Sequence, residues 1–303
     1  MIEKHGDGPR HGIVPDCDVA GSVESPTIPS SAVGDVKAII CDVDGTLLTS
    51  EYVCSPATAA AIAEVRERGY LFGLCTGRDA IGTQGQLADW GLEGLVDVIV
   101  GSGGAEVLDL QSGAYELSNP LPGDAIKEIM AHYEDMDVSF VIPYRGVLYT
   151  PEDHPRMELI SKADGLPYEV VDFDEFLAAP KPKVMIFCMP EYMEQVVERS
   201  KTFSSERYRS AALITSARLY EYMDPRISKP AGLERAAELH GFTIGEVLAF
   251  GDADNDAAMV SAVGVGVAMG NGSERTRSAA DYVTTDNDHD GIAAFLREHI
   301  IND

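Results

Sequence analysis

The amino-acid sequence predicts an α/β fold, in which a doubly wound parallel sheet is interrupted by a smaller inserted α/β domain. Short apolar segments alternate with helical segments before residue 120 and after residue 217, which is typical of open parallel sheets with helices on both faces. Three of the apolar segments end in polar clusters. Between residues 120 and 217 prolines and tyrosines break the alternation, and we expect a separate domain there.

The first half of the sheet is predicted from short apolar segments of the kind that form buried parallel strands. Helix signals lie between them, since Ser55 is a candidate N-cap, Pro56 suits a first turn and Gly69 suits a helix end. In chain order we expect a strand at 36–41, a helix at 55–69, a strand at 70–75, a helix at 79–90 and a strand at 96–100.

The same signals predict the rest of the chain. In the insertion we expect helices at 122–135 and 190–201 and strands at 138–142, 146–149, 183–189 and 211–215. After it we expect a helix at 231–240, a strand at 247–250, a helix near 257–262, strands at 263–269 and 282–284, and a helix at 291–300. The predicted domains are a flexible extension at 1–34, rich in Gly, Pro and Ser, a core formed by 35–119 and 218–303, and an insertion at 120–217.

The composition excludes several classes of function. The 50 acidic residues outnumber the 23 basic residues and give a formal net charge of −27, which would repel nucleic acids and anionic membranes as partners. The five cysteines form no CxxC pair, so we expect neither a disulfide framework nor a structural zinc site. The sequence shows no membrane span or secretory signal, and a cytoplasmic location is expected.

Polar residues follow three of the predicted strands and mark a candidate site. The three clusters are Asp42 and Asp44, then Thr76-Gly77-Arg78, then the segment 252–256. The carboxyl ends of parallel strands meet at one edge of a sheet, where ligands bind, so we expect these side chains to converge. Carboxylates brought together need a cation between them, and oxygen ligands without His or Cys favour Mg²⁺.

These clusters resemble the motifs of the haloacid dehalogenase superfamily, in the form found in its phosphatases. The segment 42–46 (DVDGT) is similar to the first motif, 76–78 (TGR) to the second, Lys229 to the lysine of the third, and 251–256 (GDADND) to the fourth. The segments 265–271 and 290–292 resemble the Cof-type subfamily, which carries a large α/β cap between the second and third motifs. The resemblance runs from about residue 36 to the C-terminus and implies a Rossmann-like core with a cap at the predicted insertion.

The resemblance implies different roles for the two acids of the first motif. Asp42 would be the nucleophile that forms an aspartyl-phosphate. Asp44 would bind the metal through its backbone carbonyl and use its carboxyl group as general acid and base. Lys229 would stabilise the phosphoryl oxygens and orient Asp42. With Asp252 as the third ligand, the expected Mg²⁺ ligands are Asp42, Asp44 and Asp252.

Five further residues are candidates for phosphate binding or support. The hydroxyl of Thr76, the backbone N–H of Gly77 and the side chain of Asn255 suit phosphate oxygens. Asp256 is expected to support the metal ligands without binding the metal itself. For Arg78 the sequence leaves two possibilities open, namely contact with phosphate or substrate, or a salt bridge at the following helix.

Two positions depart from the family pattern, and two residues of the cap are candidates for substrate recognition. Pro230 follows Lys229 where the family more often has glycine, and proline suits the first turn of a helix. Gly103 replaces the family's usual asparagine, in a loop that the resemblance places towards the substrate, so recognition is expected to differ there. In the cap, Tyr144 and Arg145 are candidates for recognising the substrate. The alternative is that they form a hairpin turn with an exposed arginine.

The sequence therefore predicts a Mg²⁺-dependent phosphatase of small phosphorylated metabolites, chiefly sugar phosphates, that works through an aspartyl-phosphate. The alternatives are a phosphotransferase or phosphomutase of the same superfamily and a catalytically weak regulatory protein. Mutases usually carry a smaller, helical cap, which disfavours that alternative. Asp44 argues against a dehalogenase, because a departing halide needs no proton. A dinucleotide-binding dehydrogenase would have GxGxxG where residues 42–45 stand.

Overall fold

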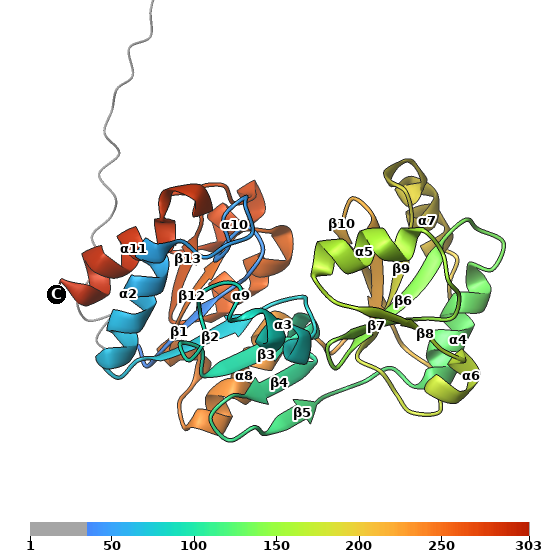
Figure 1. Cartoon of the computed structure of the whole chain (residues 1–303), viewed down its shortest axis with the longest axis horizontal. Helices are drawn as coiled ribbons and strands as arrows, with labels where there is room; N and C mark the ends of the chain where they lie inside the picture. Colours follow the sequence, from blue (N-terminus) through green and yellow to red (C-terminus); the bar gives the residue numbers. More distant parts are fainter. Residues whose placement is uncertain (1–34, 303) are drawn as a thin grey trace, which may run out of the picture.

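The computed structural model describes residues 35–302 and arranges them in two lobes that lie side by side (Figure 1). Each lobe is built on one sheet, of eight strands in the first lobe and six in the second. The segments 118–122 and 224–228 connect the two lobes. The extension expected at 1–34 lies outside the described residues.

The eight-stranded sheet forms the core lobe and has the strand order β14-β13-β12-β1-β2-β3-β4-β5. Its strands are β1 (Ala38–Cys41), β2 (Leu71–Cys75), β3 (Val98–Gly101), β4 (Glu106–Asp109), β5 (Tyr115–Leu117), β12 (Val247–Gly251), β13 (Val265–Ala268) and β14 (Tyr282–Val283). The strands from β14 to β3 pair in parallel, as predicted. The antiparallel β4 and β5 were not predicted, because their short and partly charged sequences lack a continuous apolar run.

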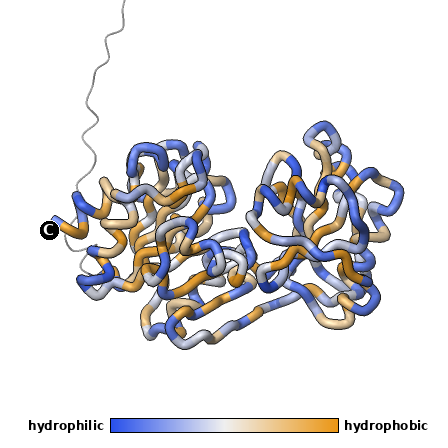
Figure 2. Tube along the Cα trace, in the orientation of Figure 1, coloured by the Kyte–Doolittle hydropathy of each residue, from blue (hydrophilic) through white to orange (hydrophobic). Residues whose placement is uncertain are grey.

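Helices cover both faces of the core sheet. On one face α2 (Pro56–Glu67) and α11 (Gly291–Leu296) pack against Ile39 and Cys41 of β1. On the other face α8 (Lys229–His240) and α9 (Ala257–Ala262) pack against Ala38 and Ile40. Two further helices of this lobe are α3 (Ala80–Gln86) and α10 (Glu274–Ala279). Burial on both faces explains why β1 is apolar throughout, as the tube in Figure 2 shows for the central strands.

The six-stranded sheet forms the cap lobe and has the strand order β10-β11-β9-β6-β7-β8. Its strands are β6 (Ser139–Tyr144), β7 (Val147–Thr150), β8 (Tyr168–Val170), β9 (Lys183–Phe187), β10 (Ala211–Ser216) and β11 (Leu219–Met223). Its helices are α4 (Gly123–His132), α5 (Arg156–Asp164), α6 (Phe173–Phe176) and α7 (Met193–Ser200). Residues of α4, α6 and α7 pack on one face of the sheet, and α5 packs on part of the other. None of the helices within residues 35–302 is long and apolar enough to cross a lipid bilayer.

The insertion ends later in the chain than the predicted boundary at residue 217. Strand β11, at Leu219–Met223, pairs with β9 and β10 and belongs to the cap sheet. This strand was not predicted, because its tyrosines and its glutamate interrupt the apolar pattern. Helix α5 was also missed, because its sequence RMELISKAD is largely polar.

Helix starts are marked in the sequence as expected. Ser55 caps α2 by accepting a hydrogen bond from the backbone N–H of Thr58, and Pro56 stands in the first turn. Ser228 caps α8 in the same way, and Pro230 stands in its first turn. The proline after Lys229 is therefore compatible with the helix, and the lysine occupies the first position of α8.

Candidate active site

The predicted polar clusters converge at one edge of the core sheet. Strand β1 lies between β12 and β2 in the sheet, so Asp42, Asp252 and Thr76, which follow these three strands, lie at neighbouring strand ends. Asp42 and Thr76 line a cavity of about 530 Å³ between the two lobes, together with Asn255. The convergence predicted from the strand-end pattern is confirmed.

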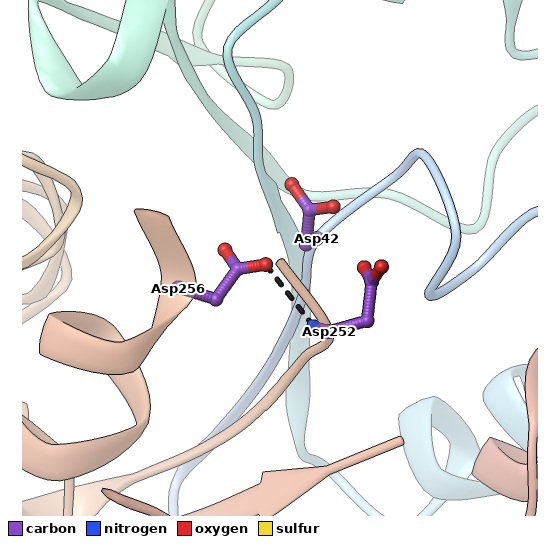
Figure 3. A group of neighbouring side chains, drawn as sticks. All are labelled: Asp42, Asp252 and Asp256. Atoms are coloured by element: carbon purple, nitrogen blue, oxygen red, sulfur yellow. Dashed lines mark hydrogen bonds between the residues drawn. The ribbon is translucent and has the colours of Figure 1, made fainter. Parts of the chain in front are cut away.

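Three carboxylates form the centre of the site. Oxygen atoms of Asp42, Asp252 and Asp256 lie within 4.8 Å of one another. Figure 3 shows the carboxylates of Asp42 and Asp252 side by side, with Asp256 bonded to the backbone of Asp252. The carboxylate of Asp256 accepts hydrogen bonds from the backbone N–H groups of Asp252 at 3.1 Å and Ala253 at 3.0 Å. These bonds hold Asp256 in place and shape the turn that carries Asp252.

Lys229 lies between two of these carboxylates. Its Nζ donates to Oδ1 of Asp42 and to Oδ1 of Asp256, in both cases at 2.5 Å. Burial acts to lower the pKa of this lysine, but the charges of Asp42 and Asp256 outweigh burial and raise the pKa above its ordinary value. Lys229 is therefore a permanent positive charge beside Asp42, although it is almost fully buried.

The cluster still carries an excess of negative charge. Three carboxylates face one ammonium group. Burial and the neighbouring Asp256 raise the pKa of Asp42 well above its ordinary value, against the opposing effect of Lys229. Burial likewise raises the pKa of Asp252 to about 6, although a hydrogen bond from Thr46, at 2.7 Å, acts to lower it. An all-oxygen site with excess negative charge fits Mg²⁺.

Asp44 is not part of this carboxylate cluster. Both of its carboxylate oxygens accept hydrogen bonds from Arg78, from Nε and Nη2, each at 2.7 Å. A third donor of Arg78, Nη1, bonds the backbone carbonyl of Asp164 at the end of α5 in the cap, at 2.9 Å. Arg78 forms a salt bridge, as one of the two possibilities held, but its partner is Asp44 after β1 and not a residue of the following helix. Arg78 also lines the cavity, so a contact with substrate stays a prediction.

The segment that follows β2 makes contacts to the cap with three consecutive residues. The carbonyl of Gly77 accepts a hydrogen bond from Lys183 Nζ at 2.9 Å, and Arg78 reaches α5 as described. The carboxylate of Asp79 accepts hydrogen bonds from the backbone N–H groups of Arg145, at 2.8 Å, and Gly146, at 2.7 Å. Sequence reasoning missed Asp79, whose only local signal is its position as the N-cap of α3.

The remaining predicted phosphate ligands lie at the cavity wall. The hydroxyl oxygen of Thr76 accepts a hydrogen bond from the backbone N–H of Arg78, at 3.1 Å, and its own proton can point towards a ligand. Gly77 and Asn255 also line the cavity. The cap contributes residues that the sequence did not single out, which include Pro143, Asp164, Lys183, Met185, Thr215, Leu219 and Glu221.

The predicted substrate readers of the cap lie elsewhere. Tyr144 and Arg145 are not among the lining residues in the described part of the chain. The guanidinium of Arg145 lies 5.2 Å from the ring centre of Tyr115, and its positive φ of 52° places it in the hairpin turn between β6 and β7. The hairpin turn with an exposed arginine is therefore the correct alternative for Arg145.

Gly103, which was expected to lie towards the substrate, faces Met223. A Cβ built at Gly103 would lie 3.9 Å from the methyl group of this methionine.

Comparisons with known proteins agree with this geometry. The family model for haloacid dehalogenase-like hydrolases matches residues 39–296. A candidate phosphatase of Haemophilus influenzae is 29% identical over 266 residues, which cover 86% of this chain and 96% of the relative. A 5-amino-6-(5-phospho-D-ribitylamino)uracil phosphatase of Bacillus subtilis is 27% identical, with 86% of this chain and 96% of the relative covered. The structure of a HAD/Cof-like hydrolase from Plasmodium vivax superposes with a TM-score of 0.78 at 22% identity, over 90% of this chain and 99% of the other.

Proposed function

The chain belongs to the haloacid dehalogenase-like hydrolase family, as the match over residues 39–296 shows, and we propose that it is a Mg²⁺-dependent phosphatase of small phosphorylated metabolites. The observation that carries this proposal is the position of Asp42. Its carboxylate lies at the end of β1, is held by Lys229 at 2.5 Å, and faces the cavity that Thr76 and Asn255 also line.

In the proposed first step, an oxygen of Asp42 attacks phosphorus and displaces the alcohol, which leaves an aspartyl-phosphate on Asp42. Lys229 bonds one oxygen of Asp42 and so orients the other towards the cavity. Thr76, Gly77 and Asn255 are placed to bind the phosphoryl oxygens during this step. An anion that attacks an anionic ester needs this surrounding positive and polar character.

Proton transfer is assigned to Asp44. Its side chain is 46% exposed, lies on the cavity wall and is anchored by two hydrogen bonds from Arg78. In this position the carboxyl group can protonate the departing oxygen and then take a proton from the water that attacks the aspartyl-phosphate. Such general acid–base catalysis contributes roughly 10²–10⁴-fold to a rate. Arg78 is a positioning residue in this scheme.

Asp42 and Asp252 are the residues proposed to hold Mg²⁺, together with the backbone carbonyl of Asp44. The donors are oxygens, and the three carboxylates exceed the one ammonium group beside them, which is the charge balance that a dication corrects. When bound, Mg²⁺ would neutralise the charge that builds up between the nucleophile and the phosphate. Asp256 is assigned a supporting role, because Lys229 and two backbone N–H groups occupy its carboxylate.

Phosphate release tests the proposal directly. The wild-type protein is expected to release phosphate from small phosphate esters in the presence of Mg²⁺ and to stop when a chelator is added. Asp42→Asn is expected to lose at least about 10³-fold in kcat, because it removes the nucleophile. Asp35→Asn, an exposed acid that precedes β1, is the matched control and should retain full activity. Full activity of Asp42→Asn would contradict the mechanism.

A further inference from the structure

We infer that Lys183 and Glu221 form the subsite that binds the alcohol part of the substrate. We also infer that they select neutral, hydroxyl-bearing leaving groups over acidic ones. This inference rests on the proposed phosphatase function and adds the substrate class. It replaces Tyr144 and Arg145, which the sequence suggested as readers and which do not line the cavity.

The cap sheet presents these two residues to the core. Strands β9 and β11 are antiparallel neighbours, in which Lys183 pairs with Met223 and Met185 pairs with Glu221. Side chains alternate between the faces of a strand, and Lys183, Met185, Leu219 and Glu221 all line the cavity. The intervening residues Val184, Ile186, Tyr220 and Tyr222 pack under the helices on the opposite face. One face of the cap sheet therefore forms the wall opposite Asp42.

The pair is buried and charged. The side chains of Lys183 and Glu221 are 3% and 6% exposed, and Lys183 Nζ donates to Glu221 Oε2 at 2.8 Å. A buried ion pair is rarely more stabilising than apolar residues of similar size. Ligand pockets are lined mostly by apolar side chains, with a few polar or charged groups that fix the orientation of the ligand. Apolar residues of the cap sheet that also line the cavity include Pro143, Met185 and Leu219.

Both groups keep hydrogen-bonding capacity for a ligand. Lys183 uses one N–H on Glu221 and a second on the carbonyl of Gly77, at 2.9 Å, and an ammonium group has three. Each oxygen of Glu221 accepts one hydrogen bond, from Lys183 and from Thr215 Oγ1 at 2.9 Å, and each has a second lone pair. A substrate hydroxyl can accept from Lys183 and donate to Glu221 at the same time.

The charge balance of this wall disfavours acidic leaving groups. Lys183 and Glu221 neutralise each other, and Asp164 and Asp44 also line the cavity, where Arg78 bonds both carboxylate oxygens of Asp44. A carboxylate or second phosphate on the substrate would therefore meet Glu221 and Asp164, while the two cations of this wall, Lys183 and Arg78, are already paired with Glu221 and Asp44. A sugar or polyol chain has hydroxyl groups and no charge, so it can form hydrogen bonds with Lys183 and Glu221 without electrostatic repulsion.

Two substrates that differ only in hydroxyl groups test the inference. The wild-type protein is compared on a pentitol phosphate and on n-pentyl phosphate, which has the same five-carbon chain and no hydroxyl. We expect kcat/KM to favour the pentitol phosphate, and a phosphorylated pentonic acid to be a poorer substrate than the pentitol phosphate. In Glu221→Gln and in the double variant Lys183→Met/Glu221→Met, the preference for pentitol over pentyl phosphate should fall at least about tenfold, because a site built for hydroxyl groups discriminates strongly against their absence.

A second buried lysine provides the matched control. Lys181 is as buried as Lys183 but donates to the carbonyls of Phe176 and Ala179 and does not line the cavity. Lys181→Met should keep the wild-type preference. The double variant removes both charges together, so that no uncompensated charge is left to unfold the cap, and thermal unfolding checks that it folds.

The outcomes separate this inference from the proposed function. Hydrolysis of both esters by the variants with an unchanged preference would overturn the subsite and leave the phosphatase mechanism standing. An equal loss on both esters would also overturn it, since the pair would then act only by supporting Gly77. Release of phosphate from no ester by the wild-type protein would contradict the proposed function itself.

Discussion

The core and the cap each place a lysine among carboxylates at the same cavity, and the two clusters differ in charge balance. In the core, Lys229 faces Asp42, Asp252 and Asp256, so one ammonium group meets three carboxylates. In the cap, Lys183 meets Glu221 alone. The core cluster is incomplete without a cation, whereas the cap cluster is neutral by itself. This difference supports the proposals that the core binds a metal and a phosphate and that the cap binds a neutral chain.

The largest expected difference between the two clusters concerns the stability of the metal-free protein. Lys229→Met leaves the buried carboxylates of Asp42 and Asp256 without a counter-charge, and breaking a buried pair in this way costs about 3–5 kcal/mol. The double variant Lys183→Met/Glu221→Met removes both charges of the cap pair and should cost little or be stabilising. Urea unfolding in the presence of a chelator measures both changes.

If Lys183→Met/Glu221→Met were destabilised as strongly as Lys229→Met, the Lys183–Glu221 pair would be structural. The proposed difference between the core and cap clusters would then be wrong. Lys181→Met serves as a reference for the loss of a buried lysine that donates hydrogen bonds to backbone carbonyls and has no carboxylate partner in the described residues.

The next expected effect is a pH dependence of Mg²⁺ affinity, which concerns the core cluster only. Burial raises the pKa of Asp252 to about 6 in the metal-free protein. Mg²⁺ binds the deprotonated carboxylate, so protons compete with the metal as the pH falls through about 6, and affinity should drop by about tenfold per pH unit for one displaced proton. Stabilisation by Mg²⁺ in thermal unfolding, followed from pH 8 to pH 5, measures this competition.

Asp252→Asn should lose the stabilisation by Mg²⁺ at every pH, because it removes a ligand. An affinity for Mg²⁺ that stays constant across this pH range in the wild-type protein would contradict the assignment of Asp252.

The smallest effect is expected at an exposed ion pair of the cap. Arg199 bonds Asp135 at 2.7 Å, with side chains that are 31% and 64% exposed. Exposed pairs contribute little to stability because water and salt screen them. Asp135→Asn should leave the unfolding midpoint and phosphatase activity unchanged. A clear loss of either would show that charge in the cap matters beyond the Lys183–Glu221 pair.

The sequence predicted where the side chains of the core cluster meet, because these residues follow strand ends. Asp42, Thr76 and Asp252 each follow an apolar strand, and parallel strands bring their carboxyl ends to one edge. The local spacing was therefore enough to predict that these side chains meet. The partner of Arg78 could not be predicted, since both an ion pair and a phosphate contact satisfy a guanidinium group.

The cap site could not be predicted in the same way. Lys183 begins an apolar strand and looks like an ordinary strand end, and Glu221 lies in a strand that was missed altogether. The two residues are 38 positions apart, and only the antiparallel pairing of β9 with β11 brings them together. Tyr144 and Arg145 were suggested by their position between two predicted cap strands, and the contact of their turn with Asp79 could not be predicted from the sequence.

The central claim is that Asp42 becomes phosphorylated, and trapping the phosphoenzyme tests it most directly. In Asp44→Asn a leaving group that departs without a proton, such as the p-nitrophenolate of p-nitrophenyl phosphate, should still be displaced, while the water that attacks the aspartyl-phosphate has lost its base. Mass spectrometry after an acid quench is then expected to find a phosphoryl group on the peptide that contains Asp42, and none in the Asp42→Asn/Asp44→Asn variant. Phosphate release by Asp44→Asn without any such adduct, or an adduct on another residue, would contradict the account.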